Sequence, residues 1–113
     1  MEIITDQITV ERLKEMAKKM FGNLVKAVVD VEKEIMAIDG ELHADLAELL
    51  AENGSKHEDV WGLNIYPELE NEDWIEFDSM INLKPLLGNR TRNVDNREIK
   101  EKILKIVSKI IKK

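Results

Sequence analysis

The chain has 113 residues, of which 43% are hydrophobic, and this length is typical of one domain with one core. It contains no cysteine, which excludes disulfide frameworks, cysteine-ligated zinc, iron–sulfur clusters and thiol nucleophiles. The formal net charge of −6 makes the protein a poor generic binder of nucleic acid.

The charges divide along the chain. Residues 1–83 carry 20 acidic and 7 basic residues, whereas residues 84–113 carry 3 acidic and 10 basic residues. The net charges of the two parts are therefore −13 and +7. We expect the two parts to lie together and neutralise each other; a basic patch that binds an anionic partner is the alternative.

No targeting or membrane-spanning segment is predicted. The first residues, MEIITDQITVERL, include acidic residues and no long apolar stretch, so they do not resemble a signal peptide. No segment approaches the roughly 20 apolar residues that a membrane span needs. We therefore expect a cytoplasmic protein without a membrane partner. Charged residues are 35% of the chain and are rich in Glu and Lys, which favours a heat-adapted source.

The first predicted elements are a short strand over residues 2–5 and a helix that begins after Thr9. Thr9 is a favoured N-cap residue, and Glu11 in the first turn suits the helix dipole. Gly22 and Asn23 end the helix. The apolar residues of this helix recur at helical spacing and form one face; they are Val10, Leu13, Ala17, Met20 and Phe21.

Residues 24–38 form the next predicted strand, because they are rich in Val and Ile. The alternation of apolar and polar residues becomes irregular in the second half of this segment, which indicates a bulge. Asp39 and Gly40 follow, and this pair is typical of a two-residue type I′ turn with both residues at positive φ. We therefore expect residues 35–38 to pair with residues 41–44 in a hairpin.

Two strands are predicted after a short helix. The helix covers residues 46–53, with Asp45 as its N-cap and Gly54 at its end. Residues 60–66 and 74–84 then alternate between apolar and polar, which is typical of strands with one buried face. The inward-facing residues are Trp61, Leu63 and Ile65 in the first strand, and Ile75, Phe77, Ser79, Ile81 and Leu83 in the second.

The last predicted element is a helix over residues 95–112, with isoleucines facing inward and lysines facing outward. The order of elements is β-α-β-β-α-β-β-α. It implies an α+β fold, with an antiparallel sheet of about four to five strands and with two long helices and one short helix packed on one face. We expect a single domain over residues 1–113.

The most unusual stretch is GELHADLAELLAENGS, residues 40–55. His43 and Asp45 project to the same side of a strand, and Glu48 and Glu52 lie one turn apart on the predicted helix. Imidazole and carboxylate groups bind Zn²⁺, Mn²⁺ or Fe²⁺, but this spacing matches no metal motif. We expect His43 to be a hydrogen-bonded structural residue, without a metal or a cofactor. A polar site of another kind is the alternative.

Polar residues alternate to the outer face of the predicted sheet. An antiparallel sheet can leave one face in water, so a solvated face is the simplest interpretation. The alternatives are a concave binding face, or a carboxylate pair such as Asp30 and Asp78 that acts as acid and base. The residues on this face are Asp30, Glu32, Asn64, Tyr66, Glu76, Asp78 and Asn82.

The loop GNRTRN, residues 88–93, places Arg90 and Arg92 on the same side if it is extended. Paired guanidinium groups suit phosphate or carboxylate. Neither glycine-rich phosphate-binding motif, GxxxxGK[ST] or GxGxxG, occurs, so ion pairs with the acidic strands are the simpler interpretation. The motif GxSxG is also absent, and no serine has an evident histidine partner for nucleophilic catalysis.

We interpret the chain as a binding or interaction module for a small molecule or a protein, which uses a polar sheet face and an arginine-containing loop. The alternative is a small hydrolase or metal-assisted enzyme that uses His43 with nearby carboxylates. A third interpretation is a protein that only self-associates, for example as a homodimer. The candidate binding residues are His43, Asp30, Asp78, Asn82, Arg90 and Arg92.

A family resemblance rests on three stretches and on the basic C-terminal helix: GELHAD, DVWGLNIYPE and FDSMINLKPLLGNR. With their flanking residues, these stretches resemble a family of small prokaryotic proteins defined as a domain of unknown function. The resemblance spans about residues 8–112, nearly the whole chain. It implies a stand-alone domain of this size, and it implies no activity, cofactor or catalytic residue.

Overall fold

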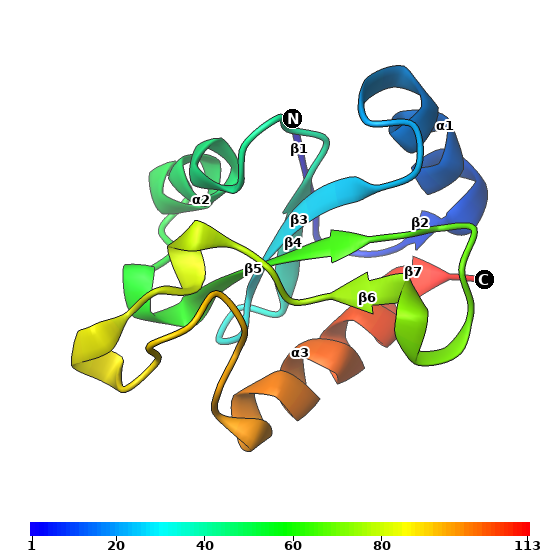
Figure 1. Ribbon diagram of the computed structural model, residues 1–113. Coiled ribbons are helices and arrows are strands. Elements are labelled where there is room, and N and C mark those ends of the chain that lie inside the picture. Colours follow the sequence, from blue (N-terminus) through cyan, green and yellow to red (C-terminus); the bar gives the residue numbers. More distant parts are fainter.

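A five-stranded antiparallel sheet forms the centre of the protein, with the strand order β1-β4-β3-β5-β6 (Figure 1). The structure is a computed structural model that describes residues 1–113. The strands of this sheet are β1 (Glu2–Ile4), β3 (Val25–Asp30), β4 (Ile35–Ile38), β5 (Val60–Ile65) and β6 (Ile75–Glu76). Two short strands, β2 (Ile8–Thr9) and β7 (Ile111–Lys112), pair in parallel outside this sheet.

Three α-helices and four 3-10 helices complete the fold. The α-helices are α1 (Val10–Met20), α2 (His43–Glu52) and α3 (Arg97–Ile110), with 11, 10 and 14 residues. The 3-10 helices are η1 (His57–Asp59), η2 (Asn71–Trp74), η3 (Met80–Asn82) and η4 (Pro85–Leu87). The predicted α+β class with an antiparallel sheet is confirmed, whereas α2 is only one residue shorter than α1.

Helices cover both faces of the sheet, which corrects the expectation that they all pack on one face. Residues of α1 and α3 pack with Ala27 and Val29 of β3 in a cluster of 19 buried hydrophobic residues. Leu46 and Leu50 of α2 pack on the opposite face, in a cluster of five with Val28 of the same strand. Successive side chains of a strand point to opposite faces, so β3 is buried on both sides. A strand buried on both faces loses the alternation that marks a half-buried one.

The signals at its ends place α1 correctly, whereas α3 is shorter than the predicted range of residues 95–112 because residues 111 and 112 form β7. Thr9 Oγ1 accepts a hydrogen bond from Arg12 N, as an N-cap residue does. Gly22 has a φ of +91°, which ends α1 in the conformation that favours glycine. Asn96 Oδ1 accepts from Ile99 N and caps α3 in the same way.

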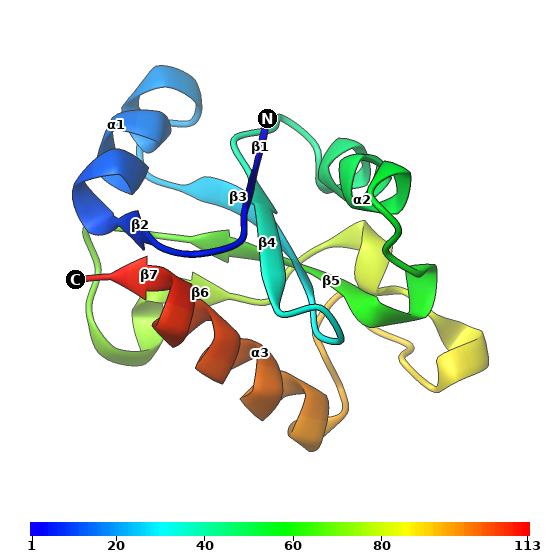
Figure 2. The same cartoon turned by 180° about the vertical axis from the view of Figure 1, so that it is seen from behind.

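The predicted strand over residues 24–38 is a hairpin of two strands. β3 and β4 pair antiparallel, with Asp30 opposite Ile35, and Glu34 in the turn between them has a φ of +56°. The expected pairing of residues 35–38 with residues 41–44 is wrong, because β4 already lies between β3 and β1 (Figure 2).

The Asp39–Gly40 pair does not form a type I′ turn. Asp39 has a φ of +66°, but Gly40 is not in the left-handed region, and both central residues of a type I′ turn need positive φ. The chain leads instead into α2, which begins at His43 rather than after Asp45. The predicted strand over residues 41–44 is therefore wrong, since residues 43 and 44 already belong to α2.

The predicted strand over residues 74–84 is wrong beyond its first residues. β6 ends at Glu76, and the 3-10 helix η3 follows. Ser79 Oγ accepts a hydrogen bond from Ile81 N, which fixes the start of η3. Side-chain hydrogen bonds of this kind compete with a strand ladder, so the alternating pattern alone misassigned the segment.

The acidic and basic parts of the chain contact each other at few ion pairs. Two pairs join them: Arg92 Nε lies 2.7 Å from Asp78 Oδ1, and Lys109 Nζ lies 3.8 Å from Glu34 Oε1. Neutralisation through direct contacts is therefore limited to two places. None of the helices combines the length and the apolar composition that crossing a membrane requires.

Candidate functional site

A cavity of about 470 Å³ lies where the N-terminus of α2 meets the ends of β3 and β5. It brings together His43, Asp78 and Arg92, three of the residues that the sequence singled out. The loop between β6 and α3 supplies Asp78 and Arg92, so segments far apart in the sequence meet here. The polar residues that line the cavity are Lys26, His43, Asn64, Asp78, Ser79 and Arg92.

His43 is the first residue of α2, and its side chain is only 8% exposed. Its Nε2 atom lies 2.8 Å from Leu63 O, which can only accept, so Nε2 carries the proton. Burial lowers the pKa of His43, although the hydrogen bond to Leu63 opposes this shift. The ring is therefore neutral at pH 7, and Nδ1 is a hydrogen-bond acceptor without a partner in the protein.

The N-terminus of α2 opens into the same cavity. Leu42 is the N-cap residue and makes no side-chain capping hydrogen bond. Asp45 is not the cap, as the sequence had suggested, because it lies inside the first turn. The backbone N–H groups of His43 and Ala44 therefore keep no partner within the protein. Free N–H groups and the helix dipole make such an end attractive to an anion.

Arg92 and Asp78 form an ion pair at the mouth of the cavity. Arg92 Nε lies 2.7 Å from Asp78 Oδ1, and both side chains are about half exposed. Nε and Oδ1 are the closest atoms of the pair, and neither the terminal nitrogens of Arg92 nor the Oδ2 atom of Asp78 makes a hydrogen bond within the protein. Asp78 therefore orients the guanidinium group and leaves its terminal fork free for a carboxylate or phosphate.

A row of polar side chains runs across β3, β5 and β6 beside the cavity, and two of them, Lys26 and Asn64, line it. Lys26 of β3 and Glu76 of β6 lie opposite Asn64 of β5 on either side. Asn64 Nδ2 donates to Glu76 Oε1 at 2.9 Å, and Tyr66 donates its hydroxyl to the same oxygen. Asn64 is 7% exposed, and its buried Oδ1 atom has no hydrogen-bond partner. Lys26 Nζ lies 5.2 Å from the centre of the Phe21 ring at the rim.

Asn82 holds the loop that carries Asp78 and Arg92. It is fully buried, accepts from Gly62 N at 2.8 Å, and donates to Gly62 O and Arg92 O at 2.9 Å each. Arg92 O also accepts from Ser79 N. Asn82 is therefore a positioning residue beneath the cavity and does not line it.

The loop GNRTRN is tied down by its own side chains, with Asn89 at its centre. Asn89 Nδ2 donates to Asn82 O at 2.7 Å, and Asn89 Oδ1 accepts from Asp95 N at 2.7 Å. The hydrogen bond from Thr91 lowers the pKa of Asp95, which also accepts from Arg90 N. The side chain of Arg90 is exposed and is not among the groups that line the cavity.

Asp30 lies away from the cavity and has a local role. It is buried, and its carboxylate accepts hydrogen bonds from Glu32 N, Lys33 N and the Ser55 hydroxyl. These bonds hold the turn between β3 and β4. Asp30 is therefore not placed to act with Asp78 as an acid–base pair.

The side chains of residues 40–55 do not form a metal site, although this stretch contains His43, Asp45, Glu48 and Glu52. No group of three or more His, Asp or Glu side chains lies close enough to hold an ion. Glu48 and Glu52 lie on α2, whose buried residues His43, Leu46 and Leu50 face the sheet.

A buried lysine is a further feature that the sequence did not reveal. Lys84 donates its amine to Val60 O at 2.7 Å and to His57 O, and it lies 4.5 Å from the centre of the Trp61 ring. Burial lowers its pKa to about 8, although Asp59 and Glu58 oppose this shift. Its position at the end of a predicted strand gave no sign of this burial.

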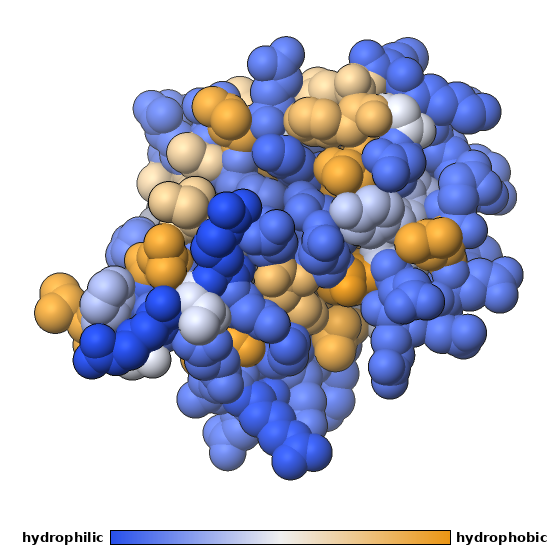
Figure 3. All heavy atoms as spheres, viewed as in Figure 1, coloured by the Kyte–Doolittle hydropathy of each residue, from blue (hydrophilic) through white to orange (hydrophobic).

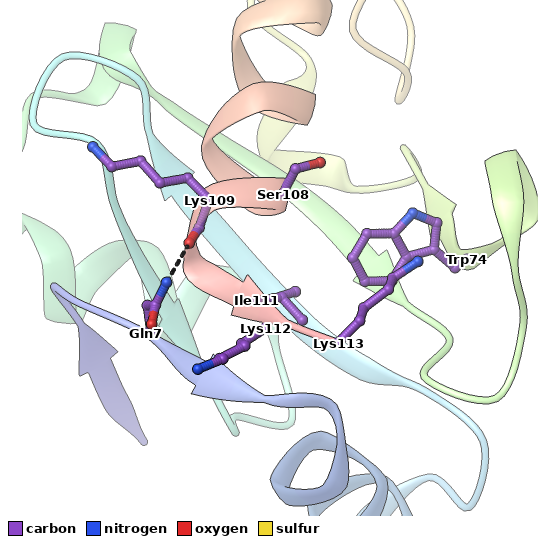
Figure 4. Close-up of a pocket in the computed structure, with 7 residues that line it drawn as sticks. All are labelled: Gln7, Trp74, Ser108, Lys109, Ile111, Lys112 and Lys113. Atoms are coloured by element: carbon purple, nitrogen blue, oxygen red, sulfur yellow. Dashed lines mark hydrogen bonds between the residues drawn. The ribbon is translucent and has the colours of Figure 1, made fainter.

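A second cavity, also of about 470 Å³, lies beside β7 (Figure 4). Gln7 Nε2 donates to Lys109 O there, and Lys113 Nζ lies 4.1 Å from the centre of the Trp74 ring. The charged groups in this cavity are surface lysines, of which Lys109 is paired with Glu34. No buried polar atom without a partner lines this cavity, in contrast to the one beside α2.

The cavity beside α2 contains residues that the sequence analysis passed over. Asn64 alternates to the polar sheet face but is not among the candidate binding residues, and the sequence does not single out Lys26. The signal that distinguishes them is their position opposite each other on neighbouring strands. Strand order supplies this information, and alternation does not.

No curated protein and no solved structure matches this chain. A family model described as a protein of unknown function (DUF5674) matches residues 2–110. This match covers nearly the whole chain and confirms the resemblance that its motifs indicated. The chain belongs to the DUF5674 family of proteins of unknown function.

Proposed function

We propose that the protein is a binding module that holds a small ligand with an anionic group in the cavity beside α2. The observation that carries this proposal is the convergence of free hydrogen-bond donors on one small space. The terminal nitrogens of Arg92, the amine of Lys26 and the backbone N–H groups of His43 and Ala44 all lie there without a buried partner.

The charges around the cavity support an anionic ligand. Two cationic side chains and the positive end of a helix surround one carboxylate, while His43 is neutral. The cavity is thus locally positive in a protein whose net charge is −6. Such a local field attracts a small anion, whereas a large polyanion such as nucleic acid meets repulsion from the rest of the surface.

Calorimetric titration with acetate and with inorganic phosphate, at constant ionic strength, tests this proposal. We expect saturable binding that Arg92→Gln weakens by about tenfold, since a hydrogen bond to a charged group contributes about 1.5–3 kcal/mol. Arg90→Gln is the matched control, because Arg90 lies in the same loop outside the cavity, and it should change affinity less than about twofold. Binding that both variants weaken equally, or no binding to either anion, would contradict the proposal.

The second candidate function is a small hydrolase that uses His43. The observation in its favour is the neutral ring of His43 with a free Nδ1 atom, in a cavity that also holds Asp78 and Ser79. A neutral imidazole with a free ring nitrogen can accept a proton as a general base. Turnover of nitrophenyl esters or phosphoesters that His43→Gln abolishes would support this function; equal turnover by the variant would exclude His43 as the base.

The proposal extends to the location, the source and the oligomeric state of the protein. We infer a single cytoplasmic domain from a prokaryotic and heat-adapted source, which binds its ligand as a monomer or a homodimer. The composition, rich in Glu and Lys, supports this inference. Oligomer mass measured with and without ligand tests whether self-association accompanies binding.

A further inference from the structure

We propose that the ligand is a small carboxylic acid whose 2-position carries a hydrogen-bond donor and an apolar side chain, as in an apolar amino acid or 2-hydroxy acid. This inference rests on the proposed function and names the ligand class of the same cavity. Three features of the cavity carry it: its free donors, its free acceptors and its apolar rim.

The free donors fit one carboxylate. The fork of terminal nitrogens on Arg92 matches the two oxygens of a carboxylate, and Asp78 already holds the guanidinium group through Nε. The N–H groups at the start of α2 and the amine of Lys26 offer further donors on the other side of the cavity. The lining carries two cationic side chains and one carboxylate, so a single negative charge balances it.

The free acceptors favour a donor on the ligand. His43 Nδ1 and Asp78 Oδ2 belong to residues that line the cavity, and neither atom makes a hydrogen bond within the protein. Asn64 lines the cavity as well, but its unpaired Oδ1 atom lies beneath the accessible surface and its Nδ2 atom donates to Glu76. A plain carboxylate or a fully ionised phosphate has only acceptors, so it displaces the water bound to His43 Nδ1 and Asp78 Oδ2 without replacing the hydrogen bonds. An amino or hydroxyl group beside the carboxylate replaces them, and an acceptor left without a hydrogen bond costs free energy.

The apolar rim provides a surface for the side chain of the ligand. Phe21, Leu42 and Met80 border the cavity and are 40%, 55% and 64% exposed. On the face seen in Figure 3, hydrophobic residues gather in small groups within a hydrophilic surface, also in the region between α1 and α2. The volume of about 470 Å³ lies in the range of small-molecule sites, which is about 300–1,000 Å³.

A comparison of three ligands with one carbon skeleton tests the inference. Calorimetric titration uses L-leucine, 2-hydroxy-4-methylpentanoate and 4-methylpentanoate at constant ionic strength. We expect the two ligands with a donor at the 2-position to bind about tenfold or more tightly than 4-methylpentanoate, because only they pair with the free acceptors. Binding of 4-methylpentanoate as tight as that of L-leucine, and dependent on Arg92, would overturn the donor inference and leave the anion-binding proposal intact.

A charge-removing variant locates the donor contact. Asp78→Asn keeps the shape of the side chain and removes one charge, so it should reduce the preference for L-leucine over 4-methylpentanoate by about fivefold or more. Asp73→Asn is the matched control, because Asp73 lies in η2 and does not line the cavity. An unchanged preference in Asp78→Asn, with an unchanged melting temperature, would contradict the assignment. If none of the three ligands binds, the inference is overturned. The titrations with acetate and phosphate then show separately whether the cavity binds anions.

Discussion

Asn82 pairs with Gly62 in the way that a neighbouring strand would. Its side-chain amide accepts from Gly62 N at 2.8 Å and donates to Gly62 O at 2.9 Å, and it donates to Arg92 O as well. One buried side chain thus replaces a strand ladder at the point where β6 has ended. Through these bonds it also fixes the loop that carries Arg92 into the cavity.

Asn82→Ala should destabilise the protein strongly. The substitution leaves the N–H and C=O of Gly62 without their partner in a buried place, and each unsatisfied group costs about 1–3 kcal/mol. We expect a loss of about 2–4 kcal/mol in the free energy of unfolding, measured by urea denaturation. Asn23→Ala, an exposed asparagine, is the control and should lie within about 0.5 kcal/mol of the parent. A small loss in Asn82→Ala would mean that water replaces the amide.

Gly62→Ala should disturb the cavity because the loop approaches β5 closely. A Cβ atom at position 62 would lie 2.5 Å from Ser79 Oγ, 2.6 Å from Ser79 Cβ and 3.2 Å from His43 Cδ2. We expect a loss of about 1–3 kcal/mol, as for other overpacked sites. Gly62→Ala should cost less in a Ser79→Gly background, which lacks the nearest contact, than in the parent. The background itself loses the hydrogen bond from Ile81 N, so the two costs are compared rather than the stabilities. An equal cost in both backgrounds would mean that the contact with Ser79 is not the cause.

Part of this site was predictable because local chemistry determines it. The alternation of Trp61, Leu63 and Ile65 gave β5, and the caps at Thr9 and Gly22 gave α1, since these signals lie within a few residues of the element that they define. His43, Asp78 and Arg92 were chosen for their side-chain chemistry, and the structure brings them to one cavity.

The rest of the site depends on long-range contacts that a local pattern does not contain. Residues 74–84 alternate as a strand would, but Asn82 reaches Gly62, which lies 20 residues earlier, and ends the ladder. Burial on both faces hid the turn between β3 and β4, because Val28 faces α2 while Ala27 and Val29 face the other helices. Asp30 and Arg90 were predicted to bind a ligand because of their charge. In the structure, Asp30 accepts hydrogen bonds in the turn between β3 and β4, and Arg90 is exposed to solvent.

Gly40→Val should destabilise the protein, for a reason other than backbone conformation. Gly40 does not have a positive φ, but a Cβ atom there would lie 2.9 Å from Leu46 Cδ2 and 3.0 Å from Leu46 Cγ, in the buried face of α2. We expect a loss of about 1–3 kcal/mol in urea denaturation. A smaller side chain at position 46 should relieve the contact, so Gly40→Val should cost less in a Leu46→Val background. An equal cost in both backgrounds would contradict this explanation.

Arg92→Ala and Arg90→Ala should differ in their dependence on salt. Arg92 pairs with Asp78, and both side chains are about half exposed, so the pair contributes about 0.2–1 kcal/mol that high salt reduces. Arg90 makes no ion pair, so Arg90→Ala should leave the free energy of unfolding unchanged within about 0.3 kcal/mol. Urea denaturation at about 0.05 and 1 M NaCl measures both. A loss in Arg92→Ala that does not change with salt would argue against charge pairing.

Lys84 should make the stability of the protein rise with pH in the alkaline range. Burial lowers its pKa to about 8 in the folded state, whereas the unfolded chain keeps the ordinary value of 10.5. Between these values the unfolded state binds more protons than the folded state, so the free energy of unfolding increases with pH. The increase in the free energy of unfolding is complete above the unfolded pKa, is absent below the folded one, and reaches up to about 3 kcal/mol.

Lys84→Met removes the titrating group and tests this pH dependence. Urea denaturation between pH 7.5 and pH 10 measures the free energy of unfolding of the parent, of Lys84→Met and of the exposed control Lys56→Met. We expect a flatter pH dependence only in Lys84→Met. Identical slopes in the parent and Lys84→Met would mean that Lys84 stays protonated when folded, held by Val60 O and the Trp61 ring.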